Sequence, residues 1–296
     1  MNYVITGSLG NISKPLAEQL VNEGHNVTVI TSRNENTAAI EAIGAKAAVG
    51  SVTDADFLTK AFSGADAVYA MVPPLWQTQS WIKDIANVGK NYATAIKNAN
   101  VKYVVNLSSV GGHMPEGCGP VSGLNHVESI LNELNGVNIK HLRPGFFYIN
   151  FLANVPMIKH MNIIGGNYGD NTELPLVHPK DIAAVAAKEL STLNFEGKTV
   201  RYIVSDFKTT NKVAQILGAA IGKPDLPWIN FTDEQTAEGL KQAGLNEEIA
   251  KNYVEMGTAI RSGEMRSDLN KHLPISLEPT NFEAFANEFA AVYNAN

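Results

Sequence analysis

Seven residues near the start of the chain have the composition and spacing of a phosphate-binding turn. Gly7-Ser8-Leu9-Gly10-Asn11-Ile12-Ser13 follows an apolar run at residues 3–6 and precedes an amphipathic stretch at residues 14–22. Gly7 lets the chain turn sharply out of a strand, and Gly10 removes a side chain that would keep a phosphate from the backbone. The free N–H groups and the dipole of a new helix attract that phosphate. This arrangement predicts a dinucleotide pyrophosphate site formed by Gly7, Ser8, Leu9, Gly10, Asn11 and Ile12.

The third position of this turn departs from the usual pattern. Ser13 stands where a third glycine often permits close packing between helix and strand, and serine is the next smallest choice. A tight strand-to-helix turn that binds no ligand is the alternative interpretation. The position of the turn, between a predicted strand and a predicted helix, favours nucleotide binding.

The residues after the second predicted strand distinguish between two nucleotides. Thr31-Ser32-Arg33-Asn34 contains no carboxylate, and the first acidic residue is Glu35. A carboxylate there would select the 2′-hydroxyl of NAD, whereas an arginine pairs with the 2′-phosphate of NADP. The planar guanidinium of Arg33 suits phosphate oxygens, and Ser32 can add a hydroxyl. We therefore expect NADPH to be preferred over NADH, with a solvated surface role for Arg33 as the alternative.

Three later segments are expected to reach the same site. Ligands of such sheets collect where the strands end, and the segments that follow predicted strands begin at Met71, Ser108 and Pro144. Two consecutive prolines make a rigid loop without N–H donors, which suits contact with a ring. The predicted cofactor contacts in these segments are Met71, Val72, Pro73, Pro74, Ser108, Pro144 and Gly145.

Apolar runs alternate with amphipathic stretches through the first half of the chain. Continuous apolar runs are typical of parallel strands buried on both faces, so the alternation predicts an α/β fold with a doubly wound parallel Rossmann sheet. The expected strands cover residues 3–6, 27–31, 47–50, 67–72, 101–108 and 139–143. The expected helices cover residues 14–22, 37–43, 55–62, 81–98 and 124–134.

The pattern changes after Pro144. Residues 165–170 are expected to form a loop, residues 182–190 a helix, residues 198–204 a late strand, and residues 232–269 mostly helix with a break near Gly244. We interpret residues 1–150 as an NAD(P)-binding Rossmann core. Residues 151–296 then form a smaller, mostly helical C-terminal substrate-side region that is interleaved with the core.

Bulk properties exclude several classes of protein. A net charge of −6 argues against a nucleic-acid-binding surface. Apolar runs are too short for a membrane span, and Cys118 is the only cysteine, which excludes an intramolecular disulfide and a cysteine-rich zinc site. We expect a cytoplasmic protein that binds no metal and acts on a small molecule; a homodimer is possible.

The chain resembles the NmrA-like group of atypical short-chain dehydrogenases/reductases over roughly residues 1–225. The stretch 142–150, Leu-Arg-Pro-Gly-Phe-Phe-Tyr-Ile-Asn, is the most specific feature after the glycine turn. Further matches are residues 6–10, 50–54, 106–109 and 177–183. The group usually has Gly-Asp where this chain has Gly50-Ser51. The resemblance implies a Rossmann fold and NADPH-dependent quinone reduction or redox sensing.

The proton-donating pair of ordinary short-chain reductases is absent. Those enzymes carry Tyr-x-x-x-Lys after the fifth strand, but no tyrosine occurs between Tyr103 and Tyr148. Ordinary ketone reduction is therefore excluded. A quinone can accept hydride without a protein acid, so we expect an oxidoreductase that transfers hydride from NADPH to a quinone or similar conjugated acceptor. The alternative is a non-catalytic NADP(H)-binding redox sensor; an isomerase or phenylpropanoid-type reductase is disfavoured, because such relatives keep a lysine in this segment.

Aromatic residues on predicted strand-end loops could hold a flat acceptor. Trp76, Phe146 and Tyr148 are the expected acceptor contacts, with core packing as the alternative for Phe146. His113 lies in a glycine-rich loop and is the one candidate catalytic residue, because it could donate a proton or a hydrogen bond. Arg143 and Asp181 are interpreted as structural, and nothing near Cys118 in the sequence would lower the pKa of its thiol.

Overall fold

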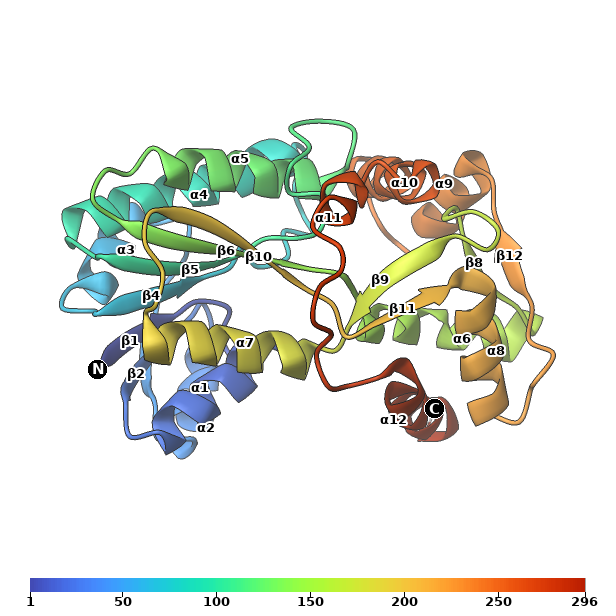
Figure 1. Ribbon diagram of the computed structural model, residues 1–296, viewed down its shortest axis with the longest axis horizontal. Coiled ribbons are helices and arrows are strands. Elements are labelled where there is room, and N and C mark those ends of the chain that lie inside the picture. The colour runs from blue at the N-terminus through green and yellow to red at the C-terminus, as the bar shows by residue number, and fades with distance from the viewer. Residues whose placement is uncertain (296) are drawn as a thin grey trace.

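A seven-stranded parallel sheet organises the half of the molecule that contains the N-terminus in the computed structural model, which describes residues 1–295 (Figure 1). Its strand order is β10-β6-β5-β4-β1-β2-β3, the order of a Rossmann fold with one further parallel strand at the β6 edge. The predicted α/β fold and parallel sheet are confirmed. The strands are β1 Asn2–Ile5, β2 Asn26–Thr31, β3 Lys46–Val49, β4 Ala67–Ala70, β5 Tyr103–Leu107, β6 Asn138–Pro144 and β10 Lys198–Ile203.

Helices cover both faces of this sheet. All four residues of β4 are buried, as a strand between two helical layers must be. One hydrophobic core joins the sheet to α1, α2 and α7, and a second joins it to α3, α4 and α5 (Figure 1). The bounds are α1 Ser13–Asn22, α2 Thr37–Ala42 and α7 Pro179–Thr192 on one face, and α3 Ala55–Phe62, α4 Trp81–Asn98 and α5 Pro120–Asn132 on the other.

Local sequence signals place the ends of these helices. The carboxylate of Asp54 accepts from the N–H groups of Asp56 and Phe57 and so begins α3. Gly24 and Gly64, which follow α1 and α3, adopt φ values of 84° and 76°. A Cβ at either glycine would meet no atom within 4 Å. Glycine is therefore favoured at these two positions by backbone conformation and not by space.

The C-terminal half contains two small sheets, orders β11-β9-β7 and β12-β8, that the sequence pattern did not predict. Residues 165–170, expected to be a loop, contribute to β8. The strands are β7 Phe146–Phe147, β8 Ile164–Gly166, β9 Glu173–Val177, β11 Asp206–Thr209 and β12 Trp228–Asn230. The helices are η1 Asn34–Asn36 in the first half, and η2 Tyr148–Asn154, α6 Val155–Met161, α8 Thr210–Ala220, α9 Asp233–Gln242, α10 Glu247–Ser262, α11 Ser267–Asn270 and α12 Phe282–Ala295 in the second.

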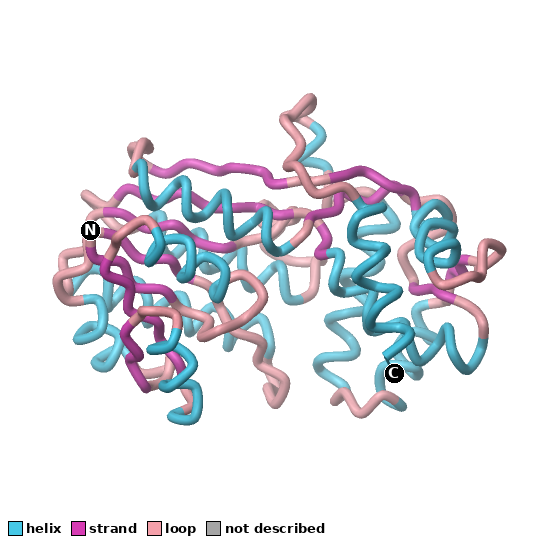
Figure 2. Tube along the Cα trace, turned by 90° about the horizontal axis from the view of Figure 1, so that it is seen from below, coloured by secondary structure: helices cyan, strands magenta, loops and turns pink. Residues whose placement is uncertain are grey.

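An aromatic core holds this second half together. Tyr148 and Phe151 of η2 are buried against Phe282, Phe285 and Phe289 of α12, so the last helix completes a core that begins more than a hundred residues earlier. Figure 2 shows the two halves side by side from below, with the C-terminus in the half opposite the N-terminus. Within residues 1–295, no helix combines the length and apolar character needed to cross a membrane.

Candidate functional site

The glycine turn adopts the backbone that its sequence predicts. Gly7 has a φ of 95° and Ser8 a φ of 54°. A Cβ at Gly7 would lie 2.7 Å from the sulfur of Met71, so glycine is required at this position by space as well as by conformation. The N–H of Gly10 donates to the carbonyl of Gly7 over 3.2 Å, which closes the turn.

Ser13 replaces the third glycine by making a bond of its own. Its hydroxyl donates to the carbonyl of Thr6 over 2.8 Å, and the serine is 2% exposed. The bond ties the first residue of α1 to the end of β1. Close helix–strand packing, which the third glycine usually permits, is therefore retained with a serine.

Backbone donors at the start of α1 lack hydrogen-bond partners in the described residues. Across the described residues, the N–H groups of Leu9, Asn11 and Ile12 have no hydrogen-bond acceptor in the protein. Gly10 and Asn11 are exposed. A helix start with free N–H groups suits a diphosphate, so the residues present fit the phosphates of a nicotinamide dinucleotide.

A polar cluster that the sequence analysis missed fixes the turn to the end of β2. The amide of Asn36 donates to the hydroxyl oxygens of Ser8 and Thr31, over 3.0 and 3.1 Å. Ser8 in turn donates to Thr31 over 3.0 Å. Ser8, Thr31 and Asn36 lie in three separate segments, so no sequence spacing indicates the cluster. The one available signal was that Thr31 precedes the residues expected to face the ribose.

Arg33 and Ser32 extend from this cluster into solvent. The side chain of Arg33 is 72% exposed, and its one ion pair is a 3.9 Å contact to the equally exposed Glu35. Such a contact contributes little, so the guanidinium is available for a ligand. The structure thus places Arg33 beside the predicted adenosine end of the site.

The segment after β4 is held by its backbone. The Met71 N–H donates to the Thr6 hydroxyl over 2.7 Å, and the Met71 carbonyl accepts from the hydroxyls of Thr6 and Tyr92. These bonds join the ends of β1 and β4. Val72 and Pro73 are half-buried and Pro74 is exposed, so the rigid loop begins directly beside Gly7.

The ends of β5 and β6 bring polar atoms together beneath the surface. The hydroxyl of Ser108 is buried and has no hydrogen-bond partner among residues 1–295. A Cβ at Gly112 would lie 2.8 Å from both this hydroxyl and a carboxylate oxygen of Glu128. Ser108 is therefore the predicted cofactor residue on this edge that retains an unused polar atom.

Pro144 and Gly145 are occupied by protein contacts. The Pro144 carbonyl accepts from the Val110 N–H over 2.9 Å, and the Gly145 N–H donates to Ile203. A Cβ at Gly145 would lie 2.4 Å from the carbonyl oxygen of Pro175 in β9. The glycine is thus explained by the close approach of β9, and cofactor contact by these two residues remains a prediction.

His113 lies beside the C-terminal half. Its Nε2 is 3.0 Å from the hydroxyl of Ser267 in α11, and its Nδ1 is buried without a partner in the described part of the chain. Burial lowers the pKa of His113, an effect that the carboxylate of Asp268 partly opposes. The ring is therefore neutral near pH 7 and has one nitrogen available to an added group.

The three predicted acceptor contacts have different environments. Trp76 is 50% exposed, and its ring lies 6.1 Å from that of Trp81. Phe146 lines a cavity of about 30 Å³ at the junction of the two halves. The prediction for Tyr148 is wrong, because this residue is fully buried and its hydroxyl donates to the Thr280 carbonyl over 2.8 Å. The apolar pattern of residues 142–150 could not distinguish Phe146, which lies at the cavity, from Tyr148, which lies in the core.

A buried ion cluster joins the two halves at this junction. Arg143 donates to both carboxylate oxygens of Glu128, over 2.9 and 2.6 Å, and to Asp268 over 3.1 Å. The Tyr202 hydroxyl lies between Arg143 and Asp268 and bonds to both. Burial would lower the pKa of Arg143, but the bonds and charge of Glu128 outweigh it, so the pKa is raised. The structural interpretation of Arg143 is supported.

Two other candidates are structural. The Asp181 carboxylate accepts from the hydroxyls of Ser205 and Thr280, over 2.7 and 2.8 Å, and thereby ties α7 to the C-terminal segment. Helix α7 is capped by His178, which accepts from the Lys180 N–H. Burial raises the pKa of the Cys118 thiol to about 12, so this cysteine is protonated near neutral pH and unreactive.

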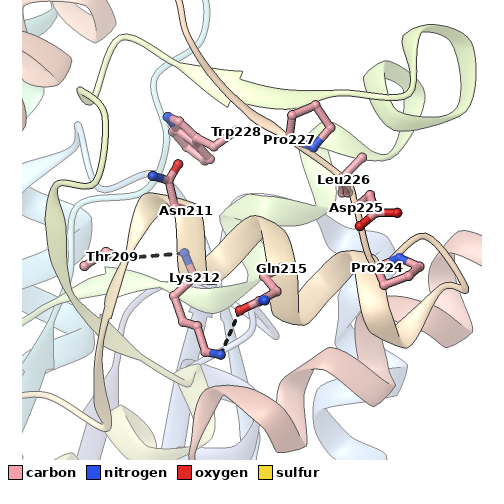
Figure 3. Close-up of a pocket in the computed structure, with 9 residues that line it drawn as sticks. All are labelled: Thr209, Asn211, Lys212, Gln215, Pro224, Asp225, Leu226, Pro227 and Trp228. Carbon is pink, nitrogen blue, oxygen red and sulfur yellow. Dashed lines mark hydrogen bonds between the residues drawn. The ribbon is translucent and has the colours of Figure 1, made fainter.

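A larger groove of about 560 Å³ lies on the C-terminal half between α8 and residues 224–228 (Figure 3). Within it, the ammonium of Lys212 donates to the side-chain oxygen of Gln215 over 2.8 Å. The groove is open and lies away from the carboxyl ends of the parallel strands, where ligands of this fold collect. We therefore place the functional site at the strand ends and not in this groove.

Comparisons with known proteins relate the N-terminal part of the chain to a nucleotide-binding family. Residues 7–133 match a family described as NAD(P)H-binding. The chain is 24% identical over 221 residues to the (4-alkanoyl-5-oxo-2,5-dihydrofuran-3-yl)methyl phosphate reductase of Streptomyces griseus, covering 75% of this chain and 74% of that one.

Solved structures extend the likeness over the whole fold. The NADPH complex of the NADPH-dependent quinone oxidoreductase QOR2 from Escherichia coli has a TM-score of 0.82 and 22% identity, over 97% of this chain and 99% of that one. The triphenylmethane reductase of Citrobacter sp. has a TM-score of 0.81 and 20% identity, over 98% and 100%. At these identities the likeness establishes the fold.

The chain therefore has the fold of these solved structures, and its N-terminal part matches an NAD(P)H-binding family. The matched residues, 7–133, include the turn, the β2 end and the β4 loop described above.

Proposed function

We propose that this protein is an NADPH-dependent oxidoreductase that transfers hydride to a quinone or a similar conjugated acceptor. Two features of the same site together carry the proposal. The dinucleotide turn has free N–H groups, and the segment after β5 lacks the Tyr-x-x-x-Lys motif. Relatives described as a quinone oxidoreductase and a triphenylmethane reductase support an electron-poor, conjugated acceptor.

Residues of the turn would hold the cofactor. The N–H groups of Leu9, Asn11 and Ile12 would bind the diphosphate, and the exposed guanidinium of Arg33 would bind the 2′-phosphate. The loop after Met71 would limit the position of the nicotinamide, because its backbone is bonded to Thr6 and Tyr92. When bound, the reduced cofactor supplies a hydride and becomes NADP⁺.

The chain supplies placement and a water-poor surface at the acceptor end. Hydride and its electron pair go to the quinone, and the resulting anion takes one proton from water or from a nearby donor to give the hydroquinone. His113, neutral and fixed by Ser267, could donate a hydrogen bond to the acceptor oxygen through Nδ1. Apolar Phe146 and Val110 would face the ring.

The test follows NADPH absorbance in the presence of menadione and other quinones. Wild-type protein should consume NADPH, and Gly10→Asp should not, because its carboxylate would stand at the anion-binding turn. A Cβ at this position would lie 3.1 Å from the Gly7 carbonyl oxygen. NADPH binding without consumption by any acceptor would contradict the proposal and favour an NADP(H)-binding redox sensor.

A further inference from the structure

A segment of the C-terminal half lies across the carboxyl edge of β5 and β6. We name residues 263–272, which include α11, the strap. Figure 1 shows α11 between the two halves, and Leu269 at its centre is fully buried against Val110 and Val204. The strap therefore covers the edge at which the acceptor is placed by the proposed function.

The space beneath the strap is too small for an acceptor. The cavity there measures about 30 Å³, and its apolar lining includes Val110, Phe146, Leu174 and Met265. A volume of that size holds about one or two water molecules, whereas pockets for small organic ligands measure roughly 300–1,000 Å³. An aromatic ring can enter this site only if the lining moves.

Four side chains fasten the strap to other elements. Asp268 bonds to Arg143 and Tyr202, Arg266 bonds to the Glu173 carboxylate over 2.8 Å, and Ser267 bonds to His113. Met265 is pressed against the loop after β5: a Cβ at Gly111 would lie 2.9 Å from its Cγ and 3.0 Å from the Cys118 sulfur.

The ion cluster is built so that one carboxylate can leave. Glu128 holds Arg143 through two bonds, and both side chains are less than 10% exposed. Asp268 is 21% exposed and meets the same guanidinium through a single nitrogen. If Asp268 moves into water, Arg143 remains neutralised by Glu128, so no buried charge is left unpaired. The attachment is therefore reversible at its most polar point.

The ends of the strap permit such a movement. Gly263, which ends α10, has a φ of 81°, and a Cβ there would meet no atom within 4 Å. Residues 271–274 at the other end are all exposed. Both ends thus lie outside the packed core, while the centre is fastened to it.

We propose that the strap is a gate over the acceptor site, latched by Asp268, and that the acceptor enters only when the strap lifts. The proposal rests on the proposed function for the identity of the ligand. It predicts that loosening the latch speeds acceptor entry and leaves nucleotide binding unchanged, because no hydrogen bond or ion pair among the described residues joins residues 7–13 to the strap.

Cys118 provides a direct reporter of opening. This thiol is fully buried under Met265 and is the only cysteine in the chain. Labelling with Ellman's reagent should be at least tenfold faster in Asp268→Ala than in wild type. The matched control is Glu278→Ala, which removes a carboxylate that pairs with Arg201 outside the strap; its labelling rate should equal that of wild type.

Acceptor entry is then measured by the association rate of menadione with protein saturated with NADP⁺, which cannot reduce it. We expect the rate to rise severalfold in Asp268→Ala, with an unchanged Kd for NADPH. If Asp268→Ala folds poorly, Arg266→Ala replaces it, because this variant removes the ion pair to Glu173. Its labelling rate and its menadione association rate should also rise. Faster labelling without faster menadione association, or no change in labelling in either variant, would overturn the gate. Since neither measurement needs turnover, an inactive wild type would refute the proposed function and leave this test intact.

Discussion

At the nucleotide turn, a residue was predictable from the sequence where only one residue type fits the backbone conformation and the space. Gly7 is required because its φ is positive and Met71 leaves no room for a Cβ. Ser13 was understood only as a small residue, and its bond to the Thr6 carbonyl became evident from the structure. Asn36 was missed, because an amide that joins two hydroxyls from separate segments leaves no spacing pattern in the sequence.

The residue-scale prediction concerns Arg33. Arg33→Ala should weaken NADPH binding by roughly 10–100-fold and leave NADH binding nearly unchanged, because charge-assisted bonds to a phosphate contribute about 1.5–3 kcal/mol. Isothermal titration with both nucleotides provides the measurement. Glu35→Gln is the matched control: it removes the neighbouring carboxylate and should not weaken NADPH binding. Equal affinities for the two nucleotides in wild type would contradict the assignment.

Whole elements of the Rossmann half were predicted well, because buried parallel strands and amphipathic helices have distinct patterns. The helix over residues 81–98 has the predicted bounds. Strands of two to five residues in the C-terminal half were missed, because so few residues do not establish a period. The Asn106–His141–Asn132 network also escaped prediction. It joins β5, β6 and α5 through bonds of 3.0 and 2.9 Å.

The element-scale prediction is an acid sensitivity caused by His141. Burial lowers the pKa of His141 to about 4, whereas an unfolded histidine has a pKa of about 6.5. On acidification the unfolded chain binds the proton first, so this contribution is complete above about pH 6.5 and is lost as pH falls towards 4. Its size is on the order of 3 kcal/mol.

Urea unfolding of wild type and His141→Gln between pH 7 and pH 4 would check this effect. Glutamine can accept from Asn106 and donate to Asn132 without titrating, so the variant should lose less stability than wild type across that window. Parallel pH profiles for the two proteins would show that His141 does not carry the effect.

At the scale of the whole molecule, the two halves are joined by contacts that the sequence could not reveal. Arg143 and Asp268 lie 125 residues apart and meet with Glu128 in one buried cluster. Asp181 joins α7 to Thr280. The sequence indicated that the C-terminal half is interleaved with the sheet, but ion pairs between distant segments depend on the folded path and not on local pattern.

The molecule-scale prediction is that breaking this cluster destabilises both halves together. Arg143→Met should cost about 3–5 kcal/mol, because it leaves the carboxylate of Glu128 buried without a cation. The double variant Glu128→Leu, Arg143→Met should recover at least half of the loss. Denaturant unfolding followed by far-UV circular dichroism and by tryptophan fluorescence should give coincident transitions. Separate transitions would show that the halves unfold independently.

The late position of α12 has a consequence for synthesis on the ribosome. Phe282, Phe285 and Phe289 fill the core around Tyr148. The carbonyl of Thr280 accepts a hydrogen bond from the hydroxyl of that tyrosine. The exit tunnel conceals the newest part of a growing chain, so these residues emerge long after Tyr148 does. The nascent polypeptide must therefore display an unfinished aromatic surface until α12 emerges, and that interval is when a chaperone would have its binding target.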